Sequence, residues 1–176
     1  MKILLVYPKY PEMLWSFKYA LKFVGKKASL PPLGLLTVAA MLPAEWQKKA
    51  VDMNVDNLKD EDIKWADYVF ISALVVQKSS VREIIQRCGK IGRKIVAGGP
   101  LFTSNQEDFN DVDHLVLGEA EITLPLFLQD IKQGLPKHIY QSAEKADLVK
   151  TPIPSWELID VKKYDSLSIQ YSRGCP

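Results

Sequence analysis

Short apolar runs alternate with amphipathic segments along most of this chain, and this alternation limits the folds open to it. The first run, residues 3–7 (ILLVY), has no polar residue at alternate positions, as expected for a strand that is covered on both faces. Strand-like runs follow at residues 49–52, 68–74, 94–97 and 114–117. Strands that are separated by helical patterns predict βαβ units and a parallel sheet.

Three helices are expected between or after these strands, over residues 33–42, 80–91 and 121–133. The middle one has the clearest signals, because Ser80 and Glu83 form a capping-box pattern and Gly92 suits the end of a helix. The sequence therefore predicts an α/β fold of three layers, α/β/α, around an open, doubly wound parallel sheet of five strands.

Composition and charge exclude several classes of protein. The formal net charge of +2 is too small to indicate a nucleic-acid partner. The longest apolar stretch, residues 33–42, is too short to span a bilayer, and the N-terminal run is too short for a signal peptide. We therefore expect a cytoplasmic protein with no membrane span. Its two cysteines, Cys88 and Cys175, do not indicate a disulfide framework.

Small residues stand where three of the predicted strands end. These ends read Ser72-Ala73-Leu74, Gly98-Gly99-Pro100 and Gly118-Glu119. In open α/β sheets, ligands bind outside the carboxyl ends of the strands, so a site is expected there. No G-x-G-x-x-G follows the first strand, and no G-x-x-x-x-G-K-[ST] is present, which excludes the usual dinucleotide and P-loop sites. Ser72 stands where a phosphoacceptor receiver domain would need an aspartate.

The double glycine and the serine each have two interpretations. A backbone without a Cβ can pass close to a bulky ligand, but Gly98-Gly99 also suits a tight turn from a strand to a helix. Ser72 belongs either to a site or to an ordinary strand end. Taken one at a time, these residues leave both interpretations open.

Their spacing resembles a cofactor signature. S-x-L at residues 72–74 and G-G at residues 98–99 are similar to the second half of the cobalamin-binding signature D-x-H-x-x-G, S-x-L, G-G. In that family the serine leaves room for the nucleotide tail of cobalamin, and the glycines let its base and sugar pack against backbone. The first half is missing, since Asp113-His114 has the wrong spacing, with Val112 where the motif needs aspartate. The resemblance thus implies a cobalamin site without a histidine ligand to cobalt.

Four segments extend the resemblance over the whole chain. In order, PPLGLLTVAAMLP, IVAGGP, VLGEAE and YSRGCP are similar to the N-terminal half of class B radical SAM proteins. These proteins have a Rossmann-like (flavodoxin-like) cobalamin-binding domain, a linker and a radical SAM barrel. The resemblance implies the cobalamin-binding domain over residues 1–140, and the linker with the first barrel strand over residues 141–176. The strand-like stretch from Ser168 would then lead into a barrel that the chain does not contain.

The same resemblance implies which residues do chemistry. Cys175 matches the first cysteine of a C-x-x-x-C-x-x-C motif, whose [4Fe–4S] cluster chelates S-adenosylmethionine; both cofactors would belong to the full-length parent only. No catalytic residue is expected within this chain. The implied cofactor-binding residues are Ser72, Leu74, Gly98, Gly99, Pro100, Gly118, Glu119, Pro32 and Gly34.

The function implied is that of a truncated cobalamin-dependent radical SAM methyltransferase, which delivers a methyl group from methylcobalamin to an unactivated carbon. The chain alone should be inactive, with its own C-terminal radical SAM domain as its partner. One alternative is a Rossmann-like domain without cofactor, which serves substrate recognition or docks to the barrel; the missing histidine motivates it. Another is a flavodoxin-like sensor of nucleotides or small molecules, which the absent phosphate loop opposes.

Overall fold

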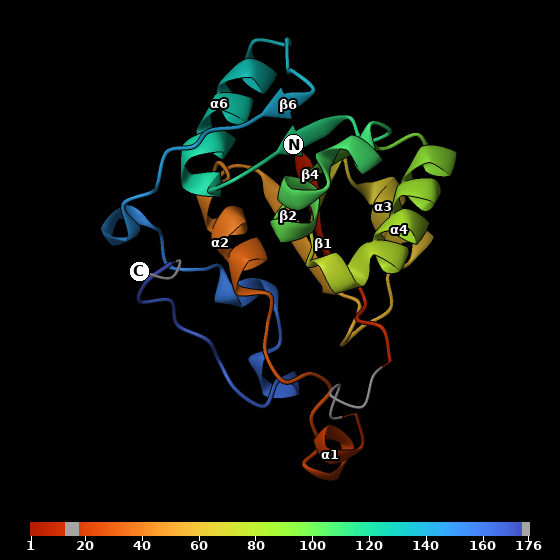
Figure 1. Cartoon of the computed structure of the whole chain (residues 1–176). Helices are drawn as coiled ribbons and strands as arrows, with labels where there is room; N and C mark the ends of the chain where they lie inside the picture. Colours follow the sequence, from red (N-terminus) through yellow and green to blue (C-terminus); the bar gives the residue numbers. More distant parts are fainter. Residues whose placement is uncertain (13–17, 174–176) are drawn as a thin grey trace.

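Six parallel strands form one sheet in the computed structural model of this protein, which describes residues 1–12 and 18–173. The order across the sheet is β2-β1-β3-β4-β5-β6, and its first five strands have the order of a flavodoxin-like doubly wound sheet. The strands are β1 (Lys2–Tyr7), β2 (Gln47–Asp52), β3 (Tyr68–Ser72), β4 (Lys94–Gly98), β5 (His114–Val116) and β6 (Ile139–Tyr140). Because all pairs are parallel, the carboxyl ends of the strands lie at one edge of the sheet (Figure 1).

The prediction of five strands was therefore wrong by one. The sixth strand, β6, has two residues, which pair with Leu115 and Val116 of β5. A strand of that length has no periodicity of its own and is defined by its partner alone. The structure also begins β2 two residues earlier than predicted and ends β3 at Ser72 rather than at Leu74.

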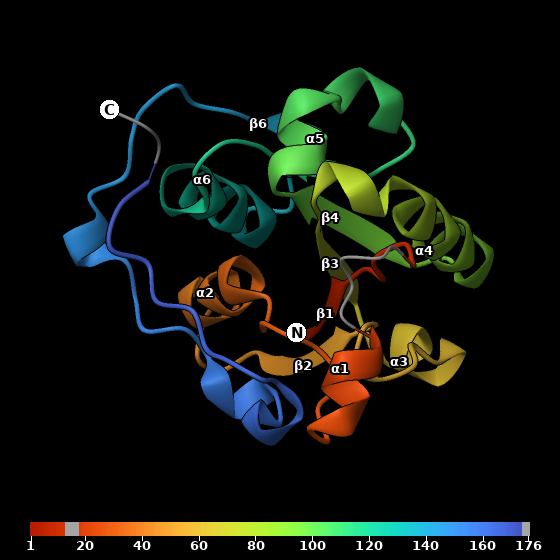
Figure 2. The same cartoon turned by 60° about the horizontal axis from the view of Figure 1, so that its bottom comes forward.

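Helices pack on both faces of the sheet (Figure 2). On one face lie α2 (Leu33–Met41) and α6 (Ala120–Lys132); on the opposite face lie α3 (Asp60–Trp65), α4 (Lys78–Ile91) and α5 (Pro100–Ser104). The segment after β1 contains α1 (Lys18–Phe23). Short 3-10 turns span Val75–Gln77, Gln106–Phe109, Leu148–Lys150, Trp156–Leu158 and Val161–Lys163. No helix within the described residues is long and apolar enough to cross a membrane.

The capping box predicted at Ser80 was wrong. Helix α4 begins at Lys78, so Ser80 lies inside its first turn, and its hydroxyl accepts a hydrogen bond from the backbone N–H of Lys9 at 3.0 Å. The predicted end of this helix is confirmed, because Gly92 has a φ of 72°, the left-handed conformation that glycine adopts without strain. The serine thus ties the segment after β1 to α4.

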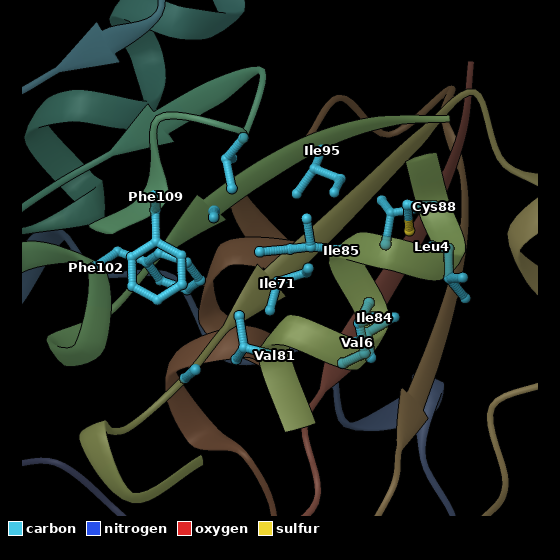
Figure 3. Packing of buried hydrophobic residues seen from close by; sticks show 14 of the residues in the cluster. Leu4, Val6, Ile71, Val81, Ile84, Ile85, Cys88, Ile95, Phe102 and Phe109 are labelled. Carbon is cyan, nitrogen blue, oxygen red and sulfur yellow. The ribbon is translucent and has the colours of Figure 1, made fainter. Parts of the chain in front are cut away.

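Alternate residues of β1 supply two separate cores. Leu4 and Val6 face the cluster under α3, α4 and α5, whereas Ile3 and Leu5 face the cluster under α2 and α6. Figure 3 shows the first cluster, in which Cys88 is buried among the side chains of β1 and α4. Cys88 is thus a core residue, as its position on the apolar side of the helical pattern predicts.

Residues 141–173, which we call the strap, run from β6 past α6 and α2 and then turn back (Figures 1 and 2). The Ser155 N–H donates to the Leu36 carbonyl of α2 at 3.1 Å, and the buried Tyr164 hydroxyl donates to Asp52 at 3.0 Å. Residues 165–173 form no strand, so the strand predicted from Ser168 is not formed in the described chain, where nothing pairs with it. Cys175 lies outside the described residues.

Candidate functional site

A cavity of about 350 Å³ lies at the carboxyl edge of the sheet, between β3, β4 and β5 and the helices α2 and α6. This is the edge at which open α/β sheets bind ligands. The cavity has the volume of a small-molecule site. Its walls include apolar side chains of the sheet and of both helices, namely Phe70, Val96 and Val116, Leu33, Leu35 and Val38, and Leu124.

The register of the strands explains why the cavity exists. Ser72, Gly98 and Val116 are neighbours on β3, β4 and β5, and one step deeper on the same face lie Phe70 and Val96. The side chain above Phe70 is a small serine, and above Val96 there is none. No large side chain therefore projects from β3 or β4 at Ser72 and Gly98, and the space left there is the deep part of the cavity.

The packing of the protein itself requires both Gly98, at the end of β4, and Gly99, which follows it. A Cβ on Gly98 would lie 2.6 Å from the Val116 carbonyl oxygen, a distance that real Cβ atoms do not tolerate. Gly99 has a φ of 92°, and its Cβ would lie 2.9 Å from the Ser72 hydroxyl. The interpretation as a tight strand-to-helix turn therefore holds, since Gly99 also caps α5. The cavity at these residues follows from the same lack of side chains.

The structure brings most of the predicted cofactor-binding residues to this cavity. Leu74 is an exception, because β3 has ended before it and its backbone N–H donates to the Gln77 side chain at 2.8 Å. Pro32 is the second exception; it is the N-cap of α2 and stands beside the lining residues without lining the cavity itself. The predicted residues that do line the cavity are Ser72, Gly98, Gly99, Pro100, Gly118, Glu119 and Gly34.

Charged side chains form one part of the rim. Glu119 follows β5 and Glu121 lies in the first turn of α6, and both make hydrogen bonds with Arg173 of the strap. The hydrogen bond from Arg173 holds the pKa of the Glu121 carboxyl below its usual value. Sequence reasoning missed Glu121, Gln170 and Arg173 as lining residues. Glu121 and Arg173 are 52 residues apart, and no local pattern signals their pairing.

Neither histidine lines this cavity. His114 begins β5, where its Nδ1 lies 2.7 Å from the Lys137 carbonyl and its ring packs beside Phe127. His138 is exposed, and its Nδ1 lies 3.1 Å from the Asp113 carbonyl. Among residues 1–12 and 18–173, no group of three His, Cys, Asp or Glu side chains is placed to hold a metal ion.

The turn after β1 carries hydroxyl groups where the cobalamin signature has its histidine. The Tyr7 and Tyr10 hydroxyls are 2.7 Å apart, and burial is the main cause that raises the pKa of Tyr7. Asn54 and Gln77 donate side-chain hydrogen bonds to the Pro8 carbonyl at 3.1 and 2.5 Å, which fixes the turn. Residues 8–12 therefore offer no imidazole for cobalt.

Comparison with known proteins adds a family and several relatives. A family profile described as the B12 binding domain matches residues 26–128. An uncharacterized methyltransferase of Synechocystis is 43% identical over 178 residues, covering 100% of this chain and 33% of the relative. A hopanoid C-2 methylase of Rhodopseudomonas palustris is 31% identical over 180 residues, with 99% and 34% covered. An uncharacterized methyltransferase of Pyrococcus horikoshii is 25% identical over 213 residues, with 100% and 44% covered. The chain thus spans about a third of the length of the first two curated relatives.

Proposed function

This chain belongs to the B12-binding domain family, and from that membership we propose that it binds cobalamin, with the nucleotide tail of the cofactor in the cavity described above. This placement is supported by the small side chain of Ser72 and the missing side chain of Gly98, which together leave a space with apolar walls. The cofactor-binding unit would be a Rossmann-like, three-layer domain over residues 1–140.

The proposed residues have different roles toward the tail. Phe70 and Val96 would form an apolar floor for a flat base, and the Ser72 hydroxyl would meet a polar edge of the sugar or base. Gly34 would leave the rim open for the tail, because a Cβ there has no atom within 4 Å. Leu74 is exposed outside the cavity and would contact the part of the cofactor that the cavity does not hold. Pro32 would act only by starting α2.

The activity that we propose belongs to a longer protein. When bound, cobalamin would supply a methyl group carried on its cobalt. The relatives named methyltransferase or methylase favour such chemistry, and each is longer than this chain. We propose that the full-length protein is a radical SAM methyltransferase in which Cys175 would be one cysteine ligand of a [4Fe–4S] cluster. The cluster would in turn bind S-adenosylmethionine. Residues 141–176 would lead into that catalytic domain, and this portion alone would be inactive.

Binding of cobalamin by this chain tests the proposal directly. We expect hydroxocobalamin to bind saturably, with a change in its visible absorption bands and co-elution with the chain in gel filtration at one equivalent. No spectral change and no co-elution at tens of micromolar would contradict the proposal. That outcome would favour the alternative of a cofactor-free domain that docks to the barrel or recognises substrate.

A further inference from the structure

The strap crosses the rim of the cavity. Gln170 and Arg173 line the cavity together with residues of the sheet, although the strap leaves the sheet at Tyr140 and passes α2 before it returns. Backbone hydrogen bonds fix the return as far as Ser166, since the Asp165 and Ser166 N–H groups donate to the Ala28 and Ser29 carbonyls at 3.0 Å. Residues 167–173 form no strand, and side chains hold them at the rim. The contacts of Arg173 therefore decide whether this wall of the cavity is present.

Arg173 is held by two carboxylates. Its Nη1 and Nη2 donate to the two oxygens of Glu121 at 2.9 and 2.6 Å, and Nη1 also lies 3.3 Å from Glu119 Oε2. The ion pair with Glu121 is bidentate, a geometry that the planar guanidinium of arginine can make and lysine cannot. The side chains are largely covered, with 25%, 17% and 12% of the Arg173, Glu119 and Glu121 side chains exposed. We call these three residues the clasp.

The same carboxylates hold an earlier part of the strap. Glu119 Oε2 accepts the backbone N–H of Ala146 at 2.7 Å, and Glu121 Oε1 accepts the hydroxyl of Thr151 at 2.9 Å. Two stretches of the strap thus meet at one pair of side chains on the rim. The Ala146 amide reports on this closure through Glu119 Oε2, the oxygen that it shares with Arg173.

A second attachment lies away from the cavity. The Tyr164 hydroxyl donates to the buried Asp52 at 3.0 Å, and Lys163 Nζ lies 2.8 Å from Asp56. These contacts do not involve the clasp. Loss of Arg173 should therefore open the strap at the rim while the strap stays attached beside β2.

We propose that the clasp positions the strap as a wall of the cofactor cavity, so that cofactor binding and clasp closure stabilise each other. This inference rests on the proposed function. A ligand in the cavity can contact Gln170 and Arg173 only when the strap is closed, so it binds the closed state more tightly than the open state. By linkage, closure must then raise the affinity for the ligand by the same factor.

Arg173 also balances charge at the rim. Without it, two carboxylates would face the cavity. Another cation, Lys145, lies 3.8 Å from Glu119 with 87% of its side chain exposed. Solvent screens such an exposed lysine strongly. We therefore expect Arg173→Ala to weaken cofactor binding, because a wall of the cavity is lost and two negative charges are left unpaired. Arg173→Lys should weaken it less, because lysine keeps the positive charge and loses only the paired hydrogen bonds of the guanidinium.

Two measurements on the same variants test the clasp. The first is hydrogen exchange of the Ala146 amide without cofactor, which should be several-fold faster in Arg173→Ala than in the wild type. The second is the Kd for hydroxocobalamin, which should rise about tenfold in Arg173→Ala. Lys150→Ala is the matched control, because it removes a strap cation whose partner at 3.5 Å is the exposed Asp147 and not the clasp; neither measurement should change.

The outcomes separate this inference from the proposed function. Equal Ala146 exchange in wild type and Arg173→Ala would overturn the clasp, whether or not cofactor binds. A changed exchange rate with an unchanged Kd would overturn the coupling and leave the proposed function intact. Failure of the wild type to bind would overturn the proposed function and the coupling with it. If Arg173→Ala does not fold, Arg173→Lys provides the comparison, with smaller expected changes in both measurements.

Discussion

Replacement of Gly98 by alanine is expected to destabilise the protein by about 3 kcal/mol, a large share of the stability of a domain of this size. The added Cβ would lie 2.6 Å from the Val116 carbonyl oxygen of the next strand. That atom belongs to the backbone of a central strand, so it can move only if β4 and β5 separate. Urea unfolding should show a lower midpoint with an unchanged slope.

Gly89 provides the control for this substitution. It lies in the exposed part of α4, and a Cβ there would meet no atom within 4 Å. Gly89→Ala should therefore raise stability by up to about 1 kcal/mol, since alanine favours helix. A Gly98→Ala protein as stable as the wild type would show that a side chain at this position does not clash with the Val116 carbonyl oxygen. The same clash means that weak cofactor binding by Gly98 variants would reflect damage to the sheet and would not locate the cofactor.

Gly34→Trp is expected to lower cobalamin affinity at least tenfold, about 1.4 kcal/mol, without loss of stability. Gly34 lines the cavity from the first turn of α2, and its Cβ direction is open. An indole there would fill space at the rim that the nucleotide tail needs, and no packed atom has to move. Titration with hydroxocobalamin measures the change in affinity, and urea unfolding checks the stability.

The same indole placed elsewhere controls for nonspecific effects. Gly89→Trp carries it on α4, on the opposite face of the sheet, and should bind cobalamin like the wild type. Gly34→Ala should also bind normally, because a methyl group leaves the rim open. Wild-type affinity in Gly34→Trp would show that the tail does not enter between α2 and the sheet.

The elements with strong local patterns could be predicted from the sequence. β1 is a continuous apolar run, α2 lies between prolines, and α4 has helical spacing that ends at a glycine with positive φ. Each signal depends on residues near one another in the chain. The parallel sheet and the position of the site at its carboxyl edge followed from the alternation of these elements.

The features that were missed depend on contacts between distant residues. β6 exists because Ile139 and Tyr140 pair with β5. The Ser80 hydroxyl, which was expected to cap α4, instead accepts a hydrogen bond from the Lys9 N–H. Residues 141–173 have the polar composition of a linker, yet Ser155 and Tyr164 are buried. Composition describes the average of such a segment, whereas a few buried residues decide where it packs.

In the candidate site, too, some features follow from local sequence and others depend on contacts between distant residues. The small residues at the ends of β3, β4 and β5 could be found from their positions, because strand ends meet at one edge. The reason for the double glycine could not, since it lies in the carbonyl of Val116 on another strand. Leu74 is outside the cavity because β3 ends two residues before it. Arg173 reaches the rim through a path that only the folded strap defines.

A comparison of cobalamin with cobinamide, which lacks the nucleotide tail, tests most directly whether the cavity holds that tail. Both ligands would be titrated into the wild-type chain under the same conditions. We expect cobalamin to bind at least tenfold more tightly, about 1.4 kcal/mol, and Gly34→Trp to remove this difference. Equal affinity of the wild type for the two ligands would contradict the account, because the cavity between β3, β4, β5, α2 and α6 would then contribute nothing to binding.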